Sequence, residues 1–445
     1  MSLGLPAVLR EQPSFRLLFA GQALSVIGDR ITPVALAFAV LELGSATDLG
    51  IIFAAGALPF ALFAVAGGVL ADRVGRREVM LVSDVVRAIV QAFTASILLT
   101  GIAEVWMLIV LSATYGMGSA LFSPALNGLI PQTVGPRDLQ SANALLALTR
   151  SAANVVGPAV AGVVVALVGS GEAIALDAAT FVVSALCLVR MRVRPVPAGA
   201  AQDAHDGFLA QLRAGWYEVR SRTWLRRGLV AMSSYHVFVL PSVFVLGPLL
   251  ADTQLDGASS WAIIVAAFGL GTIVGNAAAL RFSIRRPILV AALALVVASL
   301  QAAIIGSGLG TWGIAGLEAV AGVGVALFFT LWDLSLQEQV PPQAVARVSS
   351  YDFAVSLGLM PLGLAVAAPI ADAIGLQRTL WGMSALGVTS ALVWLAAPSV
   401  RRLERPQAAR AGPVDVPADV PVVPQAAAAA ASPEVVSPGS SGRAR

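Results

Sequence analysis

Twelve apolar segments, most of them about 20 residues or longer, follow one another along this chain of 445 residues and are separated by short polar breaks. A helix needs about 20 apolar residues to cross the roughly 30 Å hydrocarbon core of a membrane, where it satisfies its own backbone polar groups. Hydrophobic residues make up 58% of the chain and charged residues 12%, whereas an ordinary soluble domain has about a quarter charged. The pattern predicts an all-α membrane protein with twelve transmembrane helices, near 15–43, 49–71, 79–101, 104–128, 141–168, 172–190, 224–250, 258–280, 287–306, 310–334, 349–372 and 376–397.

Arginines lie on alternate connections between these segments. The connections near 72–78, 129–140, 191–223, 281–286 and 335–348 are rich in arginine, whereas the intervening ones carry mostly acids, with Arg378 as an exception. Because connections rich in Lys and Arg stay in the cytoplasm, the sequence predicts that both termini are cytoplasmic. The formal net charge of +3 then follows from topology and indicates no nucleic-acid partner.

The second half of the chain repeats features of the first. Asp48 corresponds to Asp256, and the pair Arg76–Arg77 corresponds to Arg285–Arg286. We expect a six-helix bundle at 1–190, a cytoplasmic linker with a possible interfacial helix at 191–223, a second six-helix bundle at 224–398 and a disordered cytoplasmic tail at 399–445, which is rich in Pro and Ala. Two parallel repeats around a central path are a plan of secondary transporters.

A cluster of charges, GGVLADRVGRREV at 67–79, lies between the second and third apolar segments. It resembles the signature loop of the major facilitator superfamily, G-x-L-A-D-R-x-G-R-R, at Gly68, Leu70, Ala71, Asp72, Arg73, Gly75, Arg76 and Arg77. The resemblance implies the major facilitator fold, alternating access by rocking of the two halves, and a conformational latch formed by Gly68, Asp72, Arg73, Gly75, Arg76 and Arg77. The alternative, a topology signal alone, explains the arginines but leaves the two glycines and the aspartate unexplained.

A second motif, NVVGPAVAG at 154–162, is similar to the motif of drug–proton antiporters in this superfamily, with Gly157, Pro158 and Gly162 matched and Ala153 and Ala161 in place of usual glycines. Small residues let helices approach closely and a proline kinks a helix. The resemblance implies an antiporter-like gate, and ordinary small-residue packing is the alternative.

The first apolar segment, from Phe15, and the stretch from Leu121 resemble a subgroup that includes macrolide-efflux and enterobactin-exporter proteins. This resemblance implies export of a bulky amphipathic compound. One departure is that the fourth segment contains no arginine, so the intramembrane basic motif of many antiporters in the superfamily is missing.

Charged and titratable residues within apolar segments are the candidates for proton coupling, because a charge at the bilayer centre costs about 2.5 to 3.5 kcal/mol unless it is compensated. Asp29, in the first segment, is the first candidate, since a carboxylate removed from water favours its protonated form. Glu318 is a second, and His236 a third because imidazole titrates near neutral pH. The alternatives are a structural ion pair of Asp29 with Arg150 and an ordinary core role for His236.

Two arginines and five aromatic residues are candidates for contact with a substrate. Arg30 and Arg150 can bind an anionic group or a carboxylate within the membrane, and Arg30 points about 100° away from the adjacent Asp29 on a helix. By analogy with the superfamily, the aromatic candidates for the cavity wall are Tyr115, Phe122, Tyr235, Phe238 and Trp332. We expect Asp84, Arg87, Asp177, Asp333 and Asp352 to lie near helix ends, with roles at the helix dipole or membrane surface.

The sequence contains no phosphate-binding loop and no Cys/His spacing typical of a metal site, and therefore favours neither an enzyme nor a cofactor. It predicts a monomeric secondary transporter of a bacterial inner membrane that exports an amphipathic small molecule by proton antiport. The alternative is a non-transporting membrane sensor or scaffold with the same fold.

Overall fold

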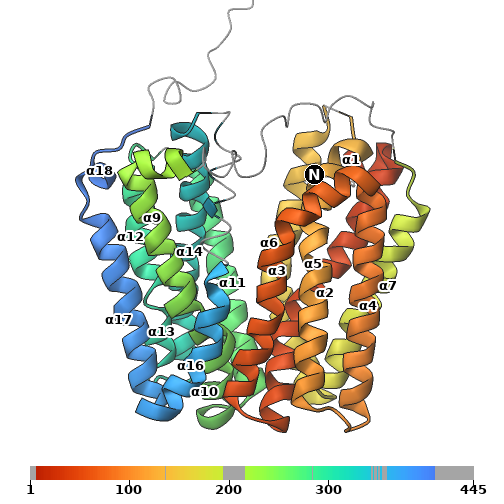
Figure 1. Ribbon diagram of the computed structural model, residues 1–445, viewed down its shortest axis with the longest axis horizontal. Coiled ribbons are helices and arrows are strands. Elements are labelled where there is room, and N and C mark those ends of the chain that lie inside the picture. Colours follow the sequence, from red (N-terminus) through yellow and green to blue (C-terminus); the bar gives the residue numbers. More distant parts are fainter. Residues whose placement is uncertain are drawn as a thin grey trace, which may run out of the picture. The chain divides into compact units, whose positions relative to one another are not determined.

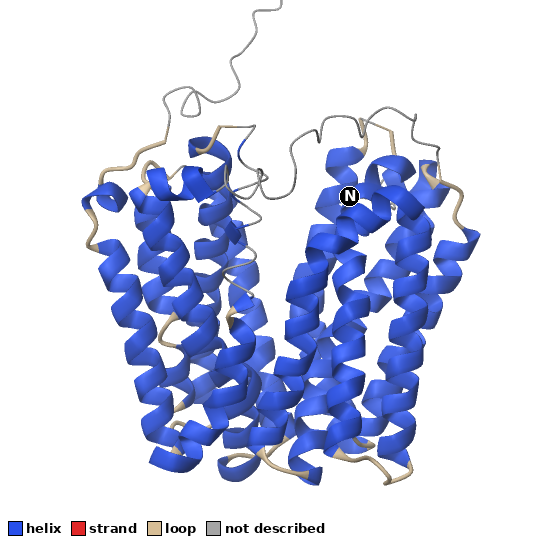
Figure 2. Ribbon diagram, in the orientation of Figure 1, coloured by secondary structure: helices blue, strands red, loops and turns tan. Residues whose placement is uncertain are grey.

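The computed structural model describes residues 7–135, 137–193, 216–282, 284–341, 344, 348, 351–352 and 358–405, with side chains described throughout except at 7, 64–73 and 280. Every regular element in these ranges is a helix (Figure 2). The first half contains α1 (Ala7–Glu11), α2 (Pro13–Leu43), α3 (Ala46–Val74), α4 (Arg76–Leu99), α5 (Val105–Thr133), α6 (Leu139–Leu167) and α7 (Ser170–Arg190). The fold is therefore all-α, as predicted.

The second half contains α9 (Thr223–Ser234), the π-helices η1 (Tyr235–Val239) and η2 (Ser242–Leu246), α10 (Gly247–Gln254), α11 (Ala258–Arg281), α12 (Pro287–Ala298), α13 (Gln301–Ile305), α14 (Thr311–Gln339), α16 (Met360–Ile374), α17 (Leu376–Leu395) and α18 (Pro398–Arg401). Ten stretches among the described residues are long and apolar enough to cross a membrane, and α16 is a shorter apolar helix. The count of twelve stays a prediction. Most of the predicted linker and of the predicted tail lies outside the described residues.

The helices pack as two groups with matching partners (Figure 1). In the first bundle, α2–α7, α3 packs on α5 and α7 packs on α2 and α4. In the second bundle, α9–α17, α11 packs on α14 and α17 packs on α9 and α12. The turns that precede α7 and α17 match as well, because each contains a glycine with positive φ, Gly169 at 120° and Gly375 at 94°, a conformation that side chains with a Cβ disfavour.

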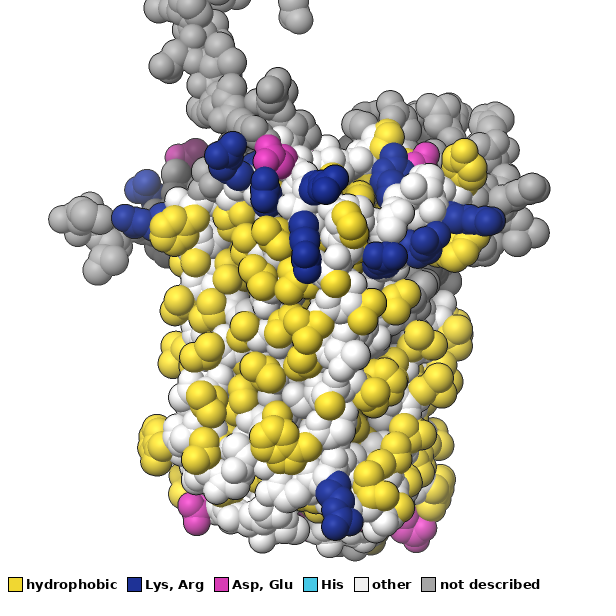
Figure 3. All heavy atoms as spheres, turned by 90° about the vertical axis from the view of Figure 1, so that its left-hand side faces the viewer, with side chains coloured by type: hydrophobic (Ala, Val, Ile, Leu, Met, Phe, Trp, Pro, Cys, Tyr) yellow, Lys and Arg dark blue, Asp and Glu magenta, His cyan; other side chains and the backbone are white. Residues whose placement is uncertain are grey.

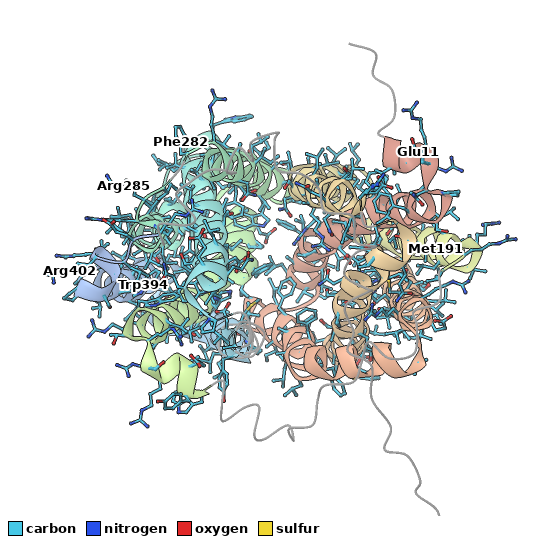
Figure 4. All side chains as sticks on the ribbon, turned by 90° about the horizontal axis from the view of Figure 1, so that it is seen from above. Glu11, Met191, Phe282, Arg285, Trp394 and Arg402 are labelled. Carbon is cyan, nitrogen blue, oxygen red and sulfur yellow. The ribbon has the colours of Figure 1, made fainter. Side chains whose placement is uncertain are left out.

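One end of both bundles carries the arginines, and we call it the arginine-rich end: α4 begins there at Arg76, and α7 and α11 end there at Arg190 and Arg281. Figure 4 views the molecule from this end, with Glu11 and Met191 on the first bundle and Arg285 and Arg402 on the second. Figure 3 shows one face of the second bundle, where a broad band of hydrophobic side chains lies below the arginines. On α17, for example, Trp381 and Val393 are 56% and 61% exposed. Such a band fits the hydrocarbon core of a membrane.

Three apolar cores hold the helices together. One belongs to the first bundle alone and includes Phe15 and Leu129, and one belongs to the second alone and includes Trp332 and Trp394. The third is shared and combines residues 31, 34–38 and 40 of α2 with parts of α3, η2, α10, α11 and α16, among others. The shared core lies at the end opposite the arginines, so the described apolar cores join the bundles at that end and are separate at the arginine-rich end.

Candidate functional site

A cavity of about 230 Å³ lies between the two bundles. The first bundle lines most of it, through α2, α3, α4, α5 and α7, and the second contributes Phe244, Met360 and Leu364. The wall is largely apolar and aromatic, with a few polar groups that include Thr32, Gln91, Ser112 and Tyr115. Of the described residues that line it, Asp29 alone carries a carboxyl group. Mostly apolar walls with a few polar groups are typical of small-molecule sites.

Asp29 lies on α2, one turn before Pro33, which also lines the cavity. Because proline has no backbone N–H, the backbone carbonyl of Asp29 lacks its usual helical donor. The side chain of Asp29 is 33% exposed, and its Oδ1 accepts a hydrogen bond of 2.7 Å from the Tyr115 hydroxyl. The same oxygen is 3.5 Å from Nη1 of Arg87. Asp29 thus forms an ion pair, as the structural alternative expects, but the partner is Arg87 on α4 and not Arg150.

Arg87 is buried and is shared between two carboxylates. Its Nη2 donates a hydrogen bond of 2.5 Å to Oδ1 of Asp84, and Asp84 also accepts one of 2.7 Å from Ser184 on α7. The guanidinium carbon lies 4.3 Å from the ring centres of both Phe122 and Phe181. Cation–π contact and two carboxylates thus compensate a charge that would otherwise be costly to bury.

A second buried carboxylate, Asp177 on α7, is the centre of a neighbouring group of hydrogen bonds. Its Oδ2 accepts hydrogen bonds of 2.6 Å from both Thr32 and Gln91, and Gln91 also donates one of 2.7 Å to the hydroxyl of Thr32. Gly28 permits this approach, because a Cβ there would lie 2.2 Å from Oδ1 of Asp177. The two polar groups together involve α2, α4, α5 and α7, and they contact the cavity through Asp29, Thr32, Gln91 and Tyr115.

The expectation that Asp84, Arg87 and Asp177 lie near helix ends, with roles at the helix dipole or membrane surface, is wrong. Asp84 and Arg87 lie well inside α4 and Asp177 well inside α7, and all three are at most 2% exposed. The sequence contains a signal for two of them. Asp84, Arg87, Gln91 and Thr94 recur on α4 at the spacing of one helix face, and a polar stripe on an apolar helix has to face protein or water.

Glu318 and His236, the other proton candidates, lie in the second bundle and do not line this cavity. Oε2 of Glu318 accepts a hydrogen bond of 2.9 Å from Gln301, whose Oε1 accepts one of 2.5 Å from Tyr235. Oε1 of Glu318 has no partner among the described residues. His236 lies in η1, with Nδ1 2.8 Å from the carbonyl of Met232 and its ring against Phe329.

The candidate substrate residues divide into separate places. Of the aromatic ones, Tyr115 lines the cavity, Phe122 packs on Arg87, Tyr235 bonds Gln301, Phe238 is half-buried, and Trp332 is fully buried against Trp224, Phe328 and Trp394. Arg30 and Arg150 are exposed, and neither forms an ion pair or hydrogen bond within the described part of the chain.

The predicted latch is described in part. Gly75 adopts φ of 117° between α3 and α4. Arg76 donates a hydrogen bond of 2.5 Å to the carbonyl of Gly128, and Arg77 donates two of 2.7 Å to the carbonyls of Leu188 and Val189. Arg77 thereby binds the negative end of the α7 dipole. Gly68, Asp72 and Arg73 belong to the stretch 64–73, whose side chains lie outside the described ones.

The predicted gate residues lie where α6 meets two neighbours. A Cβ on Gly157 would lie 2.3 Å from Cβ of Arg30 on α2, and one on Gly162 would lie 2.1 Å from Cβ of Ala262 on α11. Pro158 and Gly162 are buried inside α6. Gly162 therefore lies at a direct contact between the two bundles.

Comparisons with known proteins agree with this architecture. Residues 6–420 match the family MFS_3, described as "Transmembrane secretion effector". The chain is 25% identical over 397 residues to macrolide efflux protein A of Streptococcus pyogenes, covering 88% of this chain and 97% of that protein. It is 28% identical over 417 residues to the multidrug efflux pump Tap of Mycobacterium tuberculosis, covering 89% and 96%.

Among solved structures, a bacterial homologue of the human lysosomal transporter Spinster matches 89% of this chain and 98% of its own, with a TM-score of 0.64 and 15% identity. The nucleoside transporter NupG matches 88% and 99%, with a TM-score of 0.66 and 12% identity. Family and relatives indicate a transporter rather than an enzyme, and a multi-pass protein of a bacterial cell membrane. The chain therefore belongs to the MFS_3 family of transmembrane secretion effectors, a family of the major facilitator superfamily.

Proposed function

We propose that this protein exports an amphipathic small molecule by proton antiport and alternating access, through twelve transmembrane helices with both termini in the cytoplasm. The relatives named for macrolide and multidrug efflux support export of such a compound. The cavity supports it as well, because aromatic and aliphatic side chains such as Phe53, Phe60 and Phe244 make up much of its wall. No metal or cofactor enters this proposal, and we expect the monomer to be the transporting unit.

The separation of the apolar cores supports an inward-facing state. If the arginine-rich end lies in the cytoplasm, the shared core holds the bundles together on the opposite side of the membrane. On the cytoplasmic side each bundle has its own core, and no described apolar core joins the two. The similar Spinster homologue was solved in an inward-facing and unoccupied conformation. Ligand pockets usually measure about 300 to 1,000 Å³, so a cavity of about 230 Å³ has to widen to hold a bulky compound.

Proton coupling at Asp29 rests on the sharing of Arg87, the observation that carries the proposal. Asp29 contacts both the cavity and Arg87, whereas Asp84 binds Arg87 more closely and is fully buried. When Asp29 takes up a proton, Arg87 keeps Asp84 as its partner, so no buried charge is left uncompensated. Asp29 can therefore load and release a proton while the rest of the network stays intact.

The other candidates have secondary roles in this proposal. Glu318, buried beside Gln301, serves as a second proton site that becomes accessible only when the second bundle rearranges, and His236 is an alternative beside it. Arg76 and Arg77 act as a latch that holds α4 to α5 and α7 within the first bundle. Gly157, Pro158 and Gly162 form the surface on which α6 moves against α2 and α11.

We expect Asp29→Asn to abolish substrate-driven proton flux while substrate exchange persists, because the asparagine cannot carry the proton but can still accept the Tyr115 hydrogen bond. The measurement uses proteoliposomes with an internal pH-sensitive dye and a panel of macrolides, cationic dyes and siderophores. Asp372→Asn is the matched control, since this exposed carboxylate on α16 does not line the cavity.

Full coupling in Asp29→Asn would overturn the proton role of Asp29. If no compound of the panel moves in native protein by either flux or exchange, the sensor or scaffold alternative replaces the transport proposal.

A further inference from the structure

Two arginines without a described partner lie midway along adjacent helices. Arg30 is on α2 and Arg150 on α6, and both side chains are exposed. An arginine in the middle of a membrane span has to face protein, water or an anionic partner rather than lipid. The direction of each side chain therefore identifies the space that it serves.

Arg30 lies on the face of α2 that turns toward the second bundle. Pro33 and Ala37, three and seven residues further on, share this face. Pro33 lines the cavity, and Ala37 is buried in the core that both bundles share. Arg30 thus lies on the same face of α2 as the residues that contact the second bundle, on the side of the shared core that is nearer the arginine-rich end.

Arg150 lies on the face of α6 that contacts both α2 and the second bundle. Asn154 and Gly157 follow it at four and seven residues, on the same face. A Cβ on Gly269 of α11 would lie 2.5 Å from the carbonyl oxygen of Asn154, and Gly157 contacts Arg30. Arg150 lies about 10 Å nearer the arginine-rich end than Gly157, where each bundle has a separate core. Both arginines therefore face the space between the bundles.

Among the described side chains, no acidic group neutralises this pair locally. Neither α6 nor α11 contains an aspartate or glutamate. On α2, Asp29 is bound to Arg87 and Tyr115, and Glu42 lies near the opposite end of the helix. In the second bundle, Glu318 bonds Gln301 and Asp352 bonds Trp332, whereas Asp333 on α14 is exposed near the arginine-rich end. The positive charge of Arg30 and Arg150 is thus available to a ligand.

We propose that Arg30 and Arg150 form a dibasic site for an anionic group, a carboxylate, sulfonate or phosphate, of the transported molecule. Guanidinium groups bind such groups through paired charge-assisted hydrogen bonds. The apolar part of the molecule then lies against the aromatic wall of the adjoining cavity. This inference rests on the proposed export function and adds the charge class of the substrate. An anionic lipid headgroup shares the same chemistry and is the competing occupant.

The test compares two probes that share a fluorophore and differ in charge, dansylglycine, an anion, and dansylcadaverine, a cation. Binding is measured by dansyl fluorescence on native protein in phosphatidylcholine nanodiscs. We expect Arg30→Gln and Arg150→Gln each to lower the affinity for dansylglycine about tenfold, as for loss of one charged hydrogen bond. The affinity for dansylcadaverine should stay unchanged or rise. Arg30→Lys and Arg150→Lys should retain part of the affinity. Arg378→Gln, an exposed arginine at the opposite end, is the matched control.

The outcomes are distinguishable from failure of transport, because binding needs neither a proton gradient nor translocation. Saturable dansylglycine binding that depends on both arginines supports the site even if proteoliposomes show no flux. Weaker binding in nanodiscs that contain phosphatidylglycerol would indicate that headgroups compete for it. The inference is overturned if native protein does not bind dansylglycine, or if well-folded glutamine variants bind it as tightly as native protein does. It is also overturned if phosphatidylglycerol excludes the probe from the site entirely.

Discussion

Arg87→Gln will lower the free energy of unfolding by about 3 to 5 kcal/mol, because removal of one partner leaves buried charge uncompensated. In native protein the guanidinium forms ion pairs with both Asp29 and Asp84 and lies over the rings of Phe122 and Phe181. Glutamine provides neither the charge nor the planar cation. Unfolding can be followed with a thiol-reactive fluorogenic dye, since the single cysteine, Cys187, is half-buried on α7 near the contact with α2.

The control for this prediction is the triple variant Asp29→Asn, Asp84→Asn and Arg87→Gln, which removes all three charges together. Neutral replacement of a whole buried charge cluster is often tolerated, so the triple variant should regain much of the stability lost by Arg87→Gln. The ion-pair account is wrong if Arg87→Gln has the same unfolding free energy as native protein. It is also wrong if the triple variant loses more unfolding free energy than its three single variants lose in sum.

Gly50→Val will reduce transport at least tenfold and shift the protein toward states in which the bundles are apart at the end opposite the arginines. A Cβ on Gly50 of α3 would lie 2.3 Å from the carbonyl oxygen of Leu364 on α16. Because the nearest atom belongs to the backbone of a helix, no rotamer change relieves the overlap. The measurement is the distance between spin labels at positions 104 and 254 in a Cys187→Ser background, together with flux in proteoliposomes.

Gly382→Val on α17 is the matched control, because a Cβ at this helical glycine would meet nothing within 4 Å. It shares the β-branched side chain and the loss of a glycine, and should leave both the spin-label distance and transport unchanged. A distance distribution in Gly50→Val that equals the native one would contradict the steric account.

Much of the helical pattern can be predicted from apolar periodicity. The differences between the predicted and the observed helices have physical causes. The predicted segment 104–128 stops short of α5, which ends at Thr133, because Pro124 and Pro131 lie within the helix and do not end it. The predicted single helix at 224–250 contains two π-helical stretches. In an α-helix each backbone N–H bonds to the carbonyl four residues earlier, and in a π-helix to the carbonyl five residues earlier. The pattern of apolar residues does not distinguish these two arrangements.

The site was predictable only in part. Asp29 and Tyr115 could be found because a carboxylate and a phenol are rare in the middle of apolar segments. The sequence does not identify their partner Arg87. The predicted segment begins at residue 79, whereas α4 begins at Arg76, so Arg87 lies further from the start of the helix than the prediction places it. The pairing also depends on how α2, α4 and α7 pack, and spacing along one helix does not determine contacts with another. Trp332 illustrates the same limit: its residue type suits a cavity wall, but its neighbours Trp224 and Trp394 enclose it.

The glycine contacts between the bundles have a consequence for the energetics of opening. At Gly50, Gly162 and Gly269 the opposing atoms are backbone carbonyls or a methyl group, so the described contacts there are dispersion contacts without charge. Separation of these surfaces then breaks no ion pair, and ionic strength should have little influence on the rate. The barrier to opening depends instead on how closely two smooth helix surfaces fit, and a single added methyl group is enough to alter it.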